Sequence, residues 1–233
     1  MGLRSEPEQG QGITETEPEN QIVPALPAAP LRKKKWGALQ ISVLALAGFF
    51  PLFWLDGFTM TVNEEVKTRL WLRDFLDPLR DYGALFAQAI ILAFAYAIDR
   101  GRRRAIVVAA AGVLITNLLT QVLKISVARF RPEAGLGILA FDVPWMRIFK
   151  DARRSFPSGH TSSAFALSVF LANLYPRGRW GFYLIAACCA VTRVLDARHF
   201  PTDIYAGAIL GTVVARCVLA WEKKRCGAPA TGS

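Results

Sequence analysis

The sequence predicts an all-α membrane protein, a polytopic bundle of six transmembrane helices with both termini on the cytoplasmic side. Apolar residues make up 53% of the 233 residues, and the mean hydropathy is +0.30, which is high for an ordinary soluble domain. The apolar residues form runs long enough to cross a hydrocarbon core of roughly 30 Å. Short basic blocks separate several of these runs, a pattern typical of cytoplasmic loops in membrane proteins.

The first elements differ sharply in composition. Residues 1–31 carry five glutamates and five prolines without apolar periodicity, so we expect a disordered cytoplasmic tail. Four basic residues, 32–35, then precede an uncharged run over 36–55, which we predict as the first span. In residues 56–81 charges of both signs alternate with apolar residues. This pattern fits an amphipathic helix on the membrane surface or a plain extramembrane loop.

Five further apolar runs predict the remaining spans. They cover residues 82–98, 105–123, about 157–175, 180–194 and 204–221. In the third span Asn117, Gln121 and Lys124 form a polar stripe on one helical face, and such a stripe should face the bundle interior. Residues 132–155 are rich in proline, glycine and charge, as loops are. The six-span domain is therefore 32–225, followed by a flexible tail over 226–233.

The basic blocks predict the orientation of the bundle. With six crossings, the blocks at 32–35, 100–104, 177–179 and 223–225 all fall on one side, which the positive-inside rule makes cytoplasmic. Polar clusters at the ends of spans three to six then lie together on the exoplasmic side, periplasmic or extracellular. Their convergence indicates one site assembled from separate helices.

Composition also narrows the partners. The net charge of +10 does not indicate a nucleic-acid partner, because the basic residues are not gathered on one amphipathic face. The four cysteines show neither a disulfide framework nor a metal-ligand spacing. We therefore expect no metal and no other cofactor, and no pattern indicates an oligomeric state.

Three cations mark the predicted site. Lys124, Arg131 and Arg193 lie at the ends of apolar runs, close to the only two histidines, His160 and His199. Singly, each cation could be snorkelling at the membrane interface. Together with the histidines they match a phosphate or similar oxyanion better than a neutral ligand.

The segment Pro157-Ser158-Gly159-His160 enters a helix. Backbone N–H groups at a helix start lack intrahelical acceptors and favour anions, and Gly159 allows close approach. Ser158 could serve as an ordinary helix cap. His160 would lie near the leaving-group oxygen of a bound phosphate and could protonate it.

His199 precedes Asp203 by four residues. A carboxylate bonded to one ring nitrogen would fix the tautomer and leave the other nitrogen as a nucleophile or base. The alternative is a structural interfacial histidine, but Arg193 and Asp203 flank it where the other clusters converge.

These residues resemble the three-part signature of the type 2 phosphatidic acid phosphatase superfamily. The signature is carried by Lys124 with six residues before Arg131-Pro132, by Ser158-Gly159-His160, and by Arg193, His199 and Asp203. The resemblance covers residues 36–221. Thr192 stands where the family usually has serine before the arginine, and it keeps the hydroxyl.

The resemblance implies a membrane lipid phosphatase. Lys124, Arg131 and Arg193 would hold the phosphoryl oxygens together with Ser158 and the Gly159 backbone. His199 would attack phosphorus, Asp203 would orient His199, and His160 would protonate the leaving group. Water would then hydrolyse the phosphohistidine. This division of roles agrees with electrostatic stabilisation and positioning in phosphoryl transfer.

The substrate and the reaction leave alternatives open. Phosphatidate, phosphatidylglycerophosphate, undecaprenyl pyrophosphate and lipid A phosphates all fit a phosphate monoester or pyrophosphate headgroup. A lipid phosphotransferase would need the same pocket with another acceptor. A transporter would place charges near mid-membrane in paired repeats, whereas these clusters lie at one end. By the same resemblance, a vanadate-dependent haloperoxidase would share the oxyanion pocket. The haloperoxidases of the superfamily are soluble, however, and the six predicted spans argue against this function.

Overall fold

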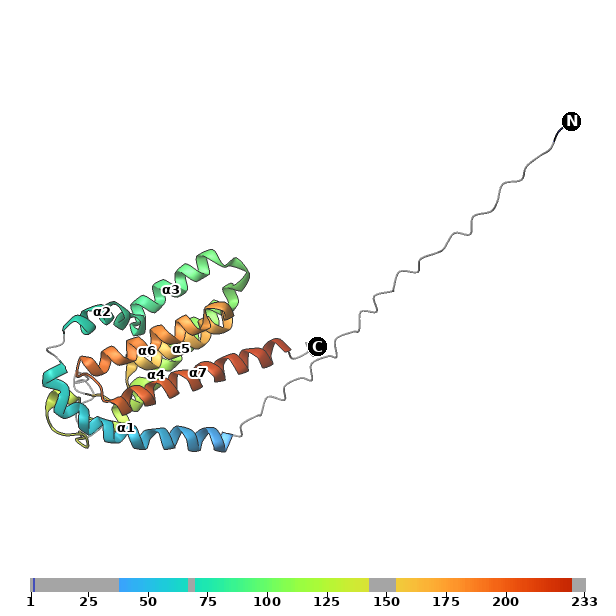
Figure 1. The fold of residues 1–233 in the computed structure, drawn as a ribbon. Coiled ribbons are helices and arrows are strands. Elements are labelled where there is room, and N and C mark those ends of the chain that lie inside the picture. The colour runs from blue at the N-terminus through green and yellow to red at the C-terminus, as the bar shows by residue number, and fades with distance from the viewer. Residues whose placement is uncertain (1, 3–37, 67–69, 143–153, 228–233) are drawn as a thin grey trace. The chain divides into compact units, whose positions relative to one another are not determined.

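The computed structural model describes Gly2 and residues 38–66, 70–142 and 154–227 (Figure 1). Within these ranges the fold is all-helical, with seven α-helices, short 3₁₀ turns and two isolated β-bridges. This confirms the all-α part of the predicted fold class. The predicted N-terminal tail lies outside the described residues apart from Gly2, and the last helix continues to Gly227.

The first helix is longer than the first apolar run. Helix α1 covers Ala38–Val66, and the short helix α2 covers Leu70–Arg80. The predicted amphipathic segment 56–81 is thus divided between two helices, of which α2 is amphipathic. Asp56 is fully buried, so the expectation that it begins a surface segment is wrong. A buried carboxylate requires hydrogen-bond donors or a cation as partners, and the partners of Asp56 lie on segments that are distant in the sequence.

The other helices follow the predicted apolar runs to within a few residues. They are α3 (Leu85–Ile98), α4 (Arg103–Val127), α5 (Gly159–Leu174), α6 (Arg179–Leu195) and α7 (Pro201–Gly227). Pro201 is the first residue of α7, as expected, because its missing N–H group has no intrahelical partner at that position.

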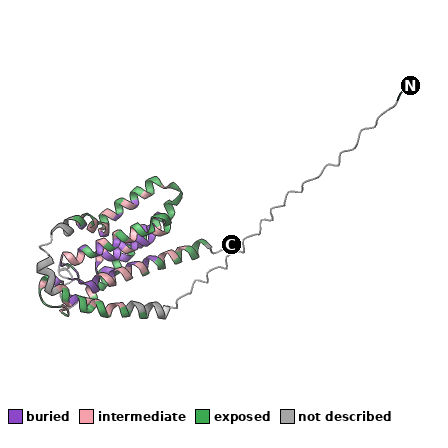
Figure 2. Cartoon of the chain, in the orientation of Figure 1, coloured by how far each residue is buried: buried purple, intermediate pink, exposed green. Residues whose placement is uncertain are grey.

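Two of the described helices are long and apolar enough to cross a membrane. They cover Arg100–Val127 and Pro201–Cys226. Phe75–Gly83 and Leu85–Ile98 form a third candidate if the pair, bent by 76°, is one broken span. Large apolar residues such as Phe86 and Leu118 are exposed, and exposed residues run along most of the helices (Figure 2). These features indicate a membrane-embedded protein, and the six-span topology stays a prediction.

Helix α5 forms the centre of the bundle. Most of its residues are buried (Figure 2), and it packs against α4, α6 and α7. Glycines allow the closest of these contacts. A Cβ atom at Gly211 of α7 would overlap the carbonyl oxygen of Ser162, and one at Gly207 would lie 2.7 Å from that of Ser158. Small residues allow such close backbone approach between membrane helices, and here they bring the start of α7 to the start of α5.

The segment after α4 brings the first polar cluster to the second. Ala128 ends α4 in the left-handed conformation, and the chain then forms a β-bridge between Phe130 and Arg154. The Ser155 N–H group donates to the Arg129 carbonyl oxygen at 2.7 Å. Residues that follow α4 are thereby fixed beside the residues that precede α5.

The close α5–α7 contact predicts a clear difference between two glycine substitutions. Gly211→Ala should lower the free energy of unfolding by about 1–3 kcal/mol, because the added methyl group overpacks the helix interface. Gly181→Ala in α6 meets no atom within 4 Å and should leave stability unchanged or slightly raised. Thermal unfolding in detergent measures both. Equal shifts of the two midpoints would contradict this packing.

Candidate active site

A polar cavity of about 440 Å³ lies where the ends of several elements meet. Three of the predicted site residues line it: Arg131, His160 and Arg193. The other lining residues are Arg80, Asp81, Glu133, Asp196 and Arg198. A cavity that joins two predicted oxyanion-binding arginines to a predicted proton donor is suited to a phosphorylated headgroup.

The loop between α6 and α7 places His199 close to Arg193. The N–H groups of Arg198 and His199 both donate to the Arg193 carbonyl oxygen, at 3.2 and 3.1 Å. Ala197 takes the left-handed conformation, with φ of 53°, and this lets the chain fold back. The five residues between Arg193 and His199 therefore form a tight turn, and they bring a cation and an imidazole together.

His199 is buried and faces Asp203. Its Nδ1 lies 3.8 Å from Asp203 Oδ2, which is longer than a hydrogen bond, and Nδ1 has no hydrogen-bond partner in the described part of the chain. Such contacts often tighten only when substrate binds. Burial lowers the pKa of His199 to about 4, with Lys124 and Arg193 adding to this effect and Asp203 opposing it.

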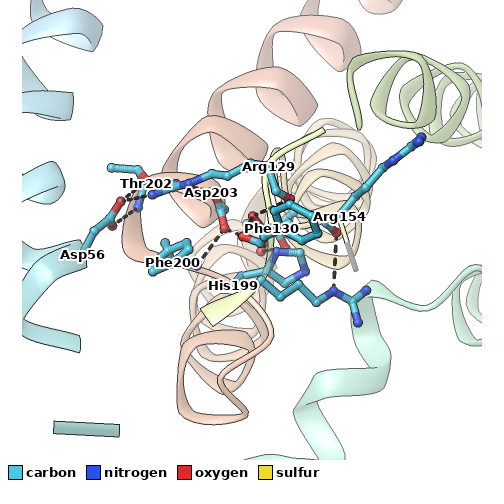
Figure 3. A network of polar contacts seen from close by, with 12 residues as sticks. Asp56, Arg129, Phe130, Arg154, His199, Phe200, Thr202 and Asp203 are labelled. Carbon is cyan, nitrogen blue, oxygen red and sulfur yellow. Dashed lines mark hydrogen bonds and ion pairs between the residues drawn. The ribbon is translucent and has the colours of Figure 1, made fainter. Parts of the chain in front are cut away.

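Asp203 is held mainly by groups other than His199. Its Oδ1 accepts a hydrogen bond from Arg129 Nη1 at 2.8 Å, and its Oδ2 accepts one from the Phe200 N–H group at 2.8 Å. Figure 3 shows Arg129 between Asp203 and Asp56. Sequence reasoning did not single out Arg129 or this role of Asp56. The available signal was an arginine beside an apolar run, between Lys124 and Arg131.

Lys124 and Gly159 lie together, whereas Ser158 has a different environment. Lys124 is buried in the last turn of α4, and a Cβ atom on Gly159 would be 3.8 Å from its Nζ. Ser158 is fully buried at the N-cap of α5 but makes no capping bond with its side chain. Its Oγ accepts a hydrogen bond from Thr161, and its N–H group donates to the Asp203 carbonyl oxygen at 3.1 Å.

The polar stripe on α4 is only partly as predicted. Lys124 is buried and Asn117 accepts a hydrogen bond from Ser163 of α5 at 2.9 Å, but Gln121 is exposed. The expectation that Gln121 faces the interior is wrong. The buried face is centred on Thr120, and the next residue along an α-helix is rotated by about 100°.

Carboxylates that sequence reasoning did not single out accompany the cavity arginines. Arg131 Nη1 lies 3.6 Å from Glu133, and Arg193 Nη1 lies 3.4 Å from Asp196. Arg193 Nε is buried without a hydrogen-bond partner among the described residues. An unpaired buried N–H group is costly, and a phosphoryl oxygen would satisfy it.

A metal-binding cluster is absent from the described residues. No group of three or more histidine, cysteine, aspartate or glutamate side chains among them is placed to hold a metal ion. The expectation that the site works without a metal or another cofactor stays a prediction.

Comparison with known proteins identifies the family. The model of the PAP2 superfamily matches residues 105–226, just over half of the chain. The chain belongs to the PAP2 superfamily. The family predicted from the three motifs is therefore confirmed, and the matched region of this PAP2 protein contains all eight predicted site residues.

Relatives of this PAP2 protein include named lipid phosphatases. Lipid A 1-phosphatase of Rhizobium johnstonii is 33% identical over 127 residues, which are 50% of this chain and 51% of that protein. Lipid phosphate phosphatase 2 of Arabidopsis thaliana is 33% identical over 132 residues, 44% of this chain and 45% of that one. The chain thus matches about half the length of these relatives.

A solved structure shares the fold. The transmembrane PAP2 type phosphatidylglycerolphosphate phosphatase from Bacillus subtilis has a TM-score of 0.54 and 21% identity. The match covers 78% of this PAP2 chain and 96% of that chain. The arrangement of helices around the cavity is therefore that of a PAP2 fold.

The lowered pKa of His199 predicts the acid side of the pH profile. If neutral His199 is required, activity limited by this group should be lost only as pH falls through about 4, because the neutral imidazole predominates above that value. We expect the acid limb of kcat/KM there, with unfolding followed in parallel. A midpoint near the ordinary histidine value of about 6.5 would contradict a buried nucleophile.

Proposed function

We propose that this protein is an integral membrane phosphatase that hydrolyses a phosphate monoester or pyrophosphate headgroup of a lipid. The observation that carries the proposal is the cavity lined by Arg131, Arg193 and His160, with buried His199 placed near Arg193 by the turn between them. Preorganised cations and a proton donor are what phosphoryl transfer requires from a protein.

Membership of the PAP2 superfamily and the names of its relatives support the substrate class. Those names describe a lipid A phosphatase and a lipid phosphate phosphatase, and the Bacillus protein is named for phosphatidylglycerolphosphate. We propose for this chain a lipid whose headgroup ends in phosphate or pyrophosphate: phosphatidate, phosphatidylglycerophosphate, undecaprenyl pyrophosphate or a lipid A phosphate.

The first chemical step transfers the phosphoryl group to His199. Because Nδ1 faces Asp203, the other ring nitrogen, Nε2, is the atom that attacks phosphorus. A P–N bond forms while the P–O bond to the lipid breaks, and His160 donates its proton to the departing oxygen. Lys124, Arg131 and Arg193 stabilise the charge on the phosphoryl oxygens.

The second step regenerates the enzyme. Neutral His160 accepts a proton from a water molecule, whose oxygen attacks phosphorus as the P–N bond breaks. Inorganic phosphate leaves, and His199 returns to its neutral form. Asp203 supports both steps by stabilising the proton on Nδ1 when the imidazole becomes charged.

We assign the site to the exoplasmic face of a six-span bundle in the cell membrane, the inner membrane where the envelope has two. The basic blocks on the opposite ends of the spans support this orientation. Single cysteines at Leu136 and Arg179, in a background without the four native cysteines, should label oppositely with an impermeant reagent on intact cells. Labelling at Arg179→Cys alone would refute the orientation.

Phosphate release from the four lipids by purified protein in detergent with EDTA tests the reaction. Wild type should turn over at least one lipid, whereas His199→Ala should lose turnover and any acid-labile phosphoenzyme. His160→Ala should lose roughly 10²- to 10⁴-fold, and less with a pyrophosphate lipid, whose leaving group needs little protonation. Arg104→Gln, remote from the cavity, is the control.

Three outcomes would count against the proposal in different ways. Phosphoenzyme in His199→Ala would remove His199 as the nucleophile. Activity that EDTA abolishes and magnesium or zinc restores would show that a metal takes part. Loss of lipid phosphate without free phosphate would identify a phosphotransferase instead of a hydrolase.

A further inference from the structure

We propose that Arg129 and Asp56 are positioning residues for His199, acting through Asp203. The proposal rests on the proposed role of His199 as nucleophile. The contacts that carry it form a continuous chain of buried charges, from Asp56 on α1, through Arg129 after α4, to Asp203 on α7 (Figure 3). At its end lies the imidazole of His199.

Every N–H donor of the Arg129 guanidinium has an acceptor. Nε donates to the Ile138 carbonyl oxygen at 3.0 Å, and Nη2 donates to the same oxygen and to Asp56 Oδ2, at 2.8 and 2.9 Å. Nη1 donates to Thr202 Oγ1 at 2.7 Å and to Asp203 Oδ1 at 2.8 Å. A guanidinium has five N–H groups, so its orientation is completely determined.

Asp56 fixes the side of Arg129 that faces away from the site. Its Oδ2 accepts hydrogen bonds from Arg129 and from Thr202 Oγ1 at 2.5 Å. Its Oδ1 accepts one from the Thr202 N–H group at 3.0 Å. Thr202 is the second residue of α7, whose first N–H groups lack intrahelical acceptors. Asp56 therefore ties α1 both to Arg129 and to the start of the helix that carries Asp203.

The anchoring of Asp203 determines which oxygen can meet His199. Arg129 holds Oδ1 and the Phe200 N–H group holds Oδ2, so the carboxylate cannot rotate freely. The Arg129 guanidinium also lies over the Phe200 ring, 4.1 Å from its centroid. The remaining lone pair of Oδ2 is left for Nδ1 of His199. A fixed carboxylate at Nδ1 selects the tautomer that has Nε2 free to attack.

Arg129 also compensates the negative charges of Asp56 and Asp203. Asp56 and Asp203 are both fully buried, and Arg129 is the cation that contacts both. Without it, two buried carboxylates would lie close together without the cation that compensates their charge. Lys124, Arg193 and His160 are further charged or titratable groups near His199. Loss of Arg129 would remove the contact that orients Asp203 beside Nδ1 of His199.

The chain offers a direct readout of the tautomer, because it contains only two histidines. Full-length protein labelled with ¹⁵N-histidine gives two imidazole spin systems in detergent micelles, and His160→Gln assigns them. We expect wild-type His199 to be protonated on Nδ1 at neutral pH. The double variant Asp56→Asn with Arg129→Gln removes one buried charge of each sign, so the fold retains charge balance while Asp203 loses its anchor.

For this double variant we expect a mixture of His199 tautomers. We also expect kcat lower by about 10- to 100-fold, with KM unchanged, by analogy with the loss when a residue that orients a metal-bound histidine is replaced. Arg129→Lys keeps the charge but has only three donors, so it should show the same loss in milder form. The control is Arg104→Gln with Glu222→Gln. It removes an ion pair that joins the start of α4 to the last part of α7, away from the site, and should behave as wild type.

Two results would overturn the positioning role. One is a folded double variant that keeps the Nδ1 proton and wild-type kcat. The other, decisive if the double variant does not fold, is an Arg129→Lys protein whose tautomer and kcat match wild type. If wild type releases phosphate from none of the four lipids, the proposed function fails, whereas the tautomer measurement still decides whether Arg129 positions His199.

Discussion

The burial of Arg129 constrains the geometry of the whole polar end of the bundle. A guanidinium that is removed from water needs acceptors for all of its donors, and these come from parts of the chain that are remote in sequence. Asp56 on α1, Asp203 on α7 and the Ile138 carbonyl oxygen must therefore meet at one point. That meeting point fixes the start of α7, and with it the loop that carries His199.

Close packing of α5 against α7 supplies the second part of the geometry. Gly207 and Gly211 let the two helices approach until backbone meets backbone, and the Ser158 N–H group then reaches the Asp203 carbonyl oxygen. The first residues of both helices become neighbours as a result. This brings His160 on α5 near His199 before α7, although 38 residues separate them along the chain, and the proposed mechanism uses both at one phosphoryl group.

The sequence allowed most helices and the family to be predicted, because apolar runs, basic blocks and motif spacing are local signals. It also allowed the convergence of Arg131, His160 and Arg193 to be predicted, since each follows or begins an apolar run. Ion pairs between residues that are distant in the sequence could not be predicted from it. No pattern in the sequence around Asp56 indicates that it is buried against an arginine 73 residues away.

The misplacement of Gln121 has a similar physical cause. A stripe of polar residues defines a helical face only to within the rotation of one residue, and this placed Gln121 inside when the buried face is centred on Thr120. Ser158 was predicted beside the phosphate, and the structure buries its side chain against Thr161. Its contact with the phosphate stays a prediction.

A structure of the full chain bound to orthovanadate, which imitates a phosphoryl group in transfer, tests the central claim most directly. We expect vanadium bonded to Nε2 of His199, with its oxygens on Arg131, Arg193 and Lys124 and with His160 facing the apical oxygen. Vanadate bound in the cavity away from His199, or outside the cavity, would contradict it.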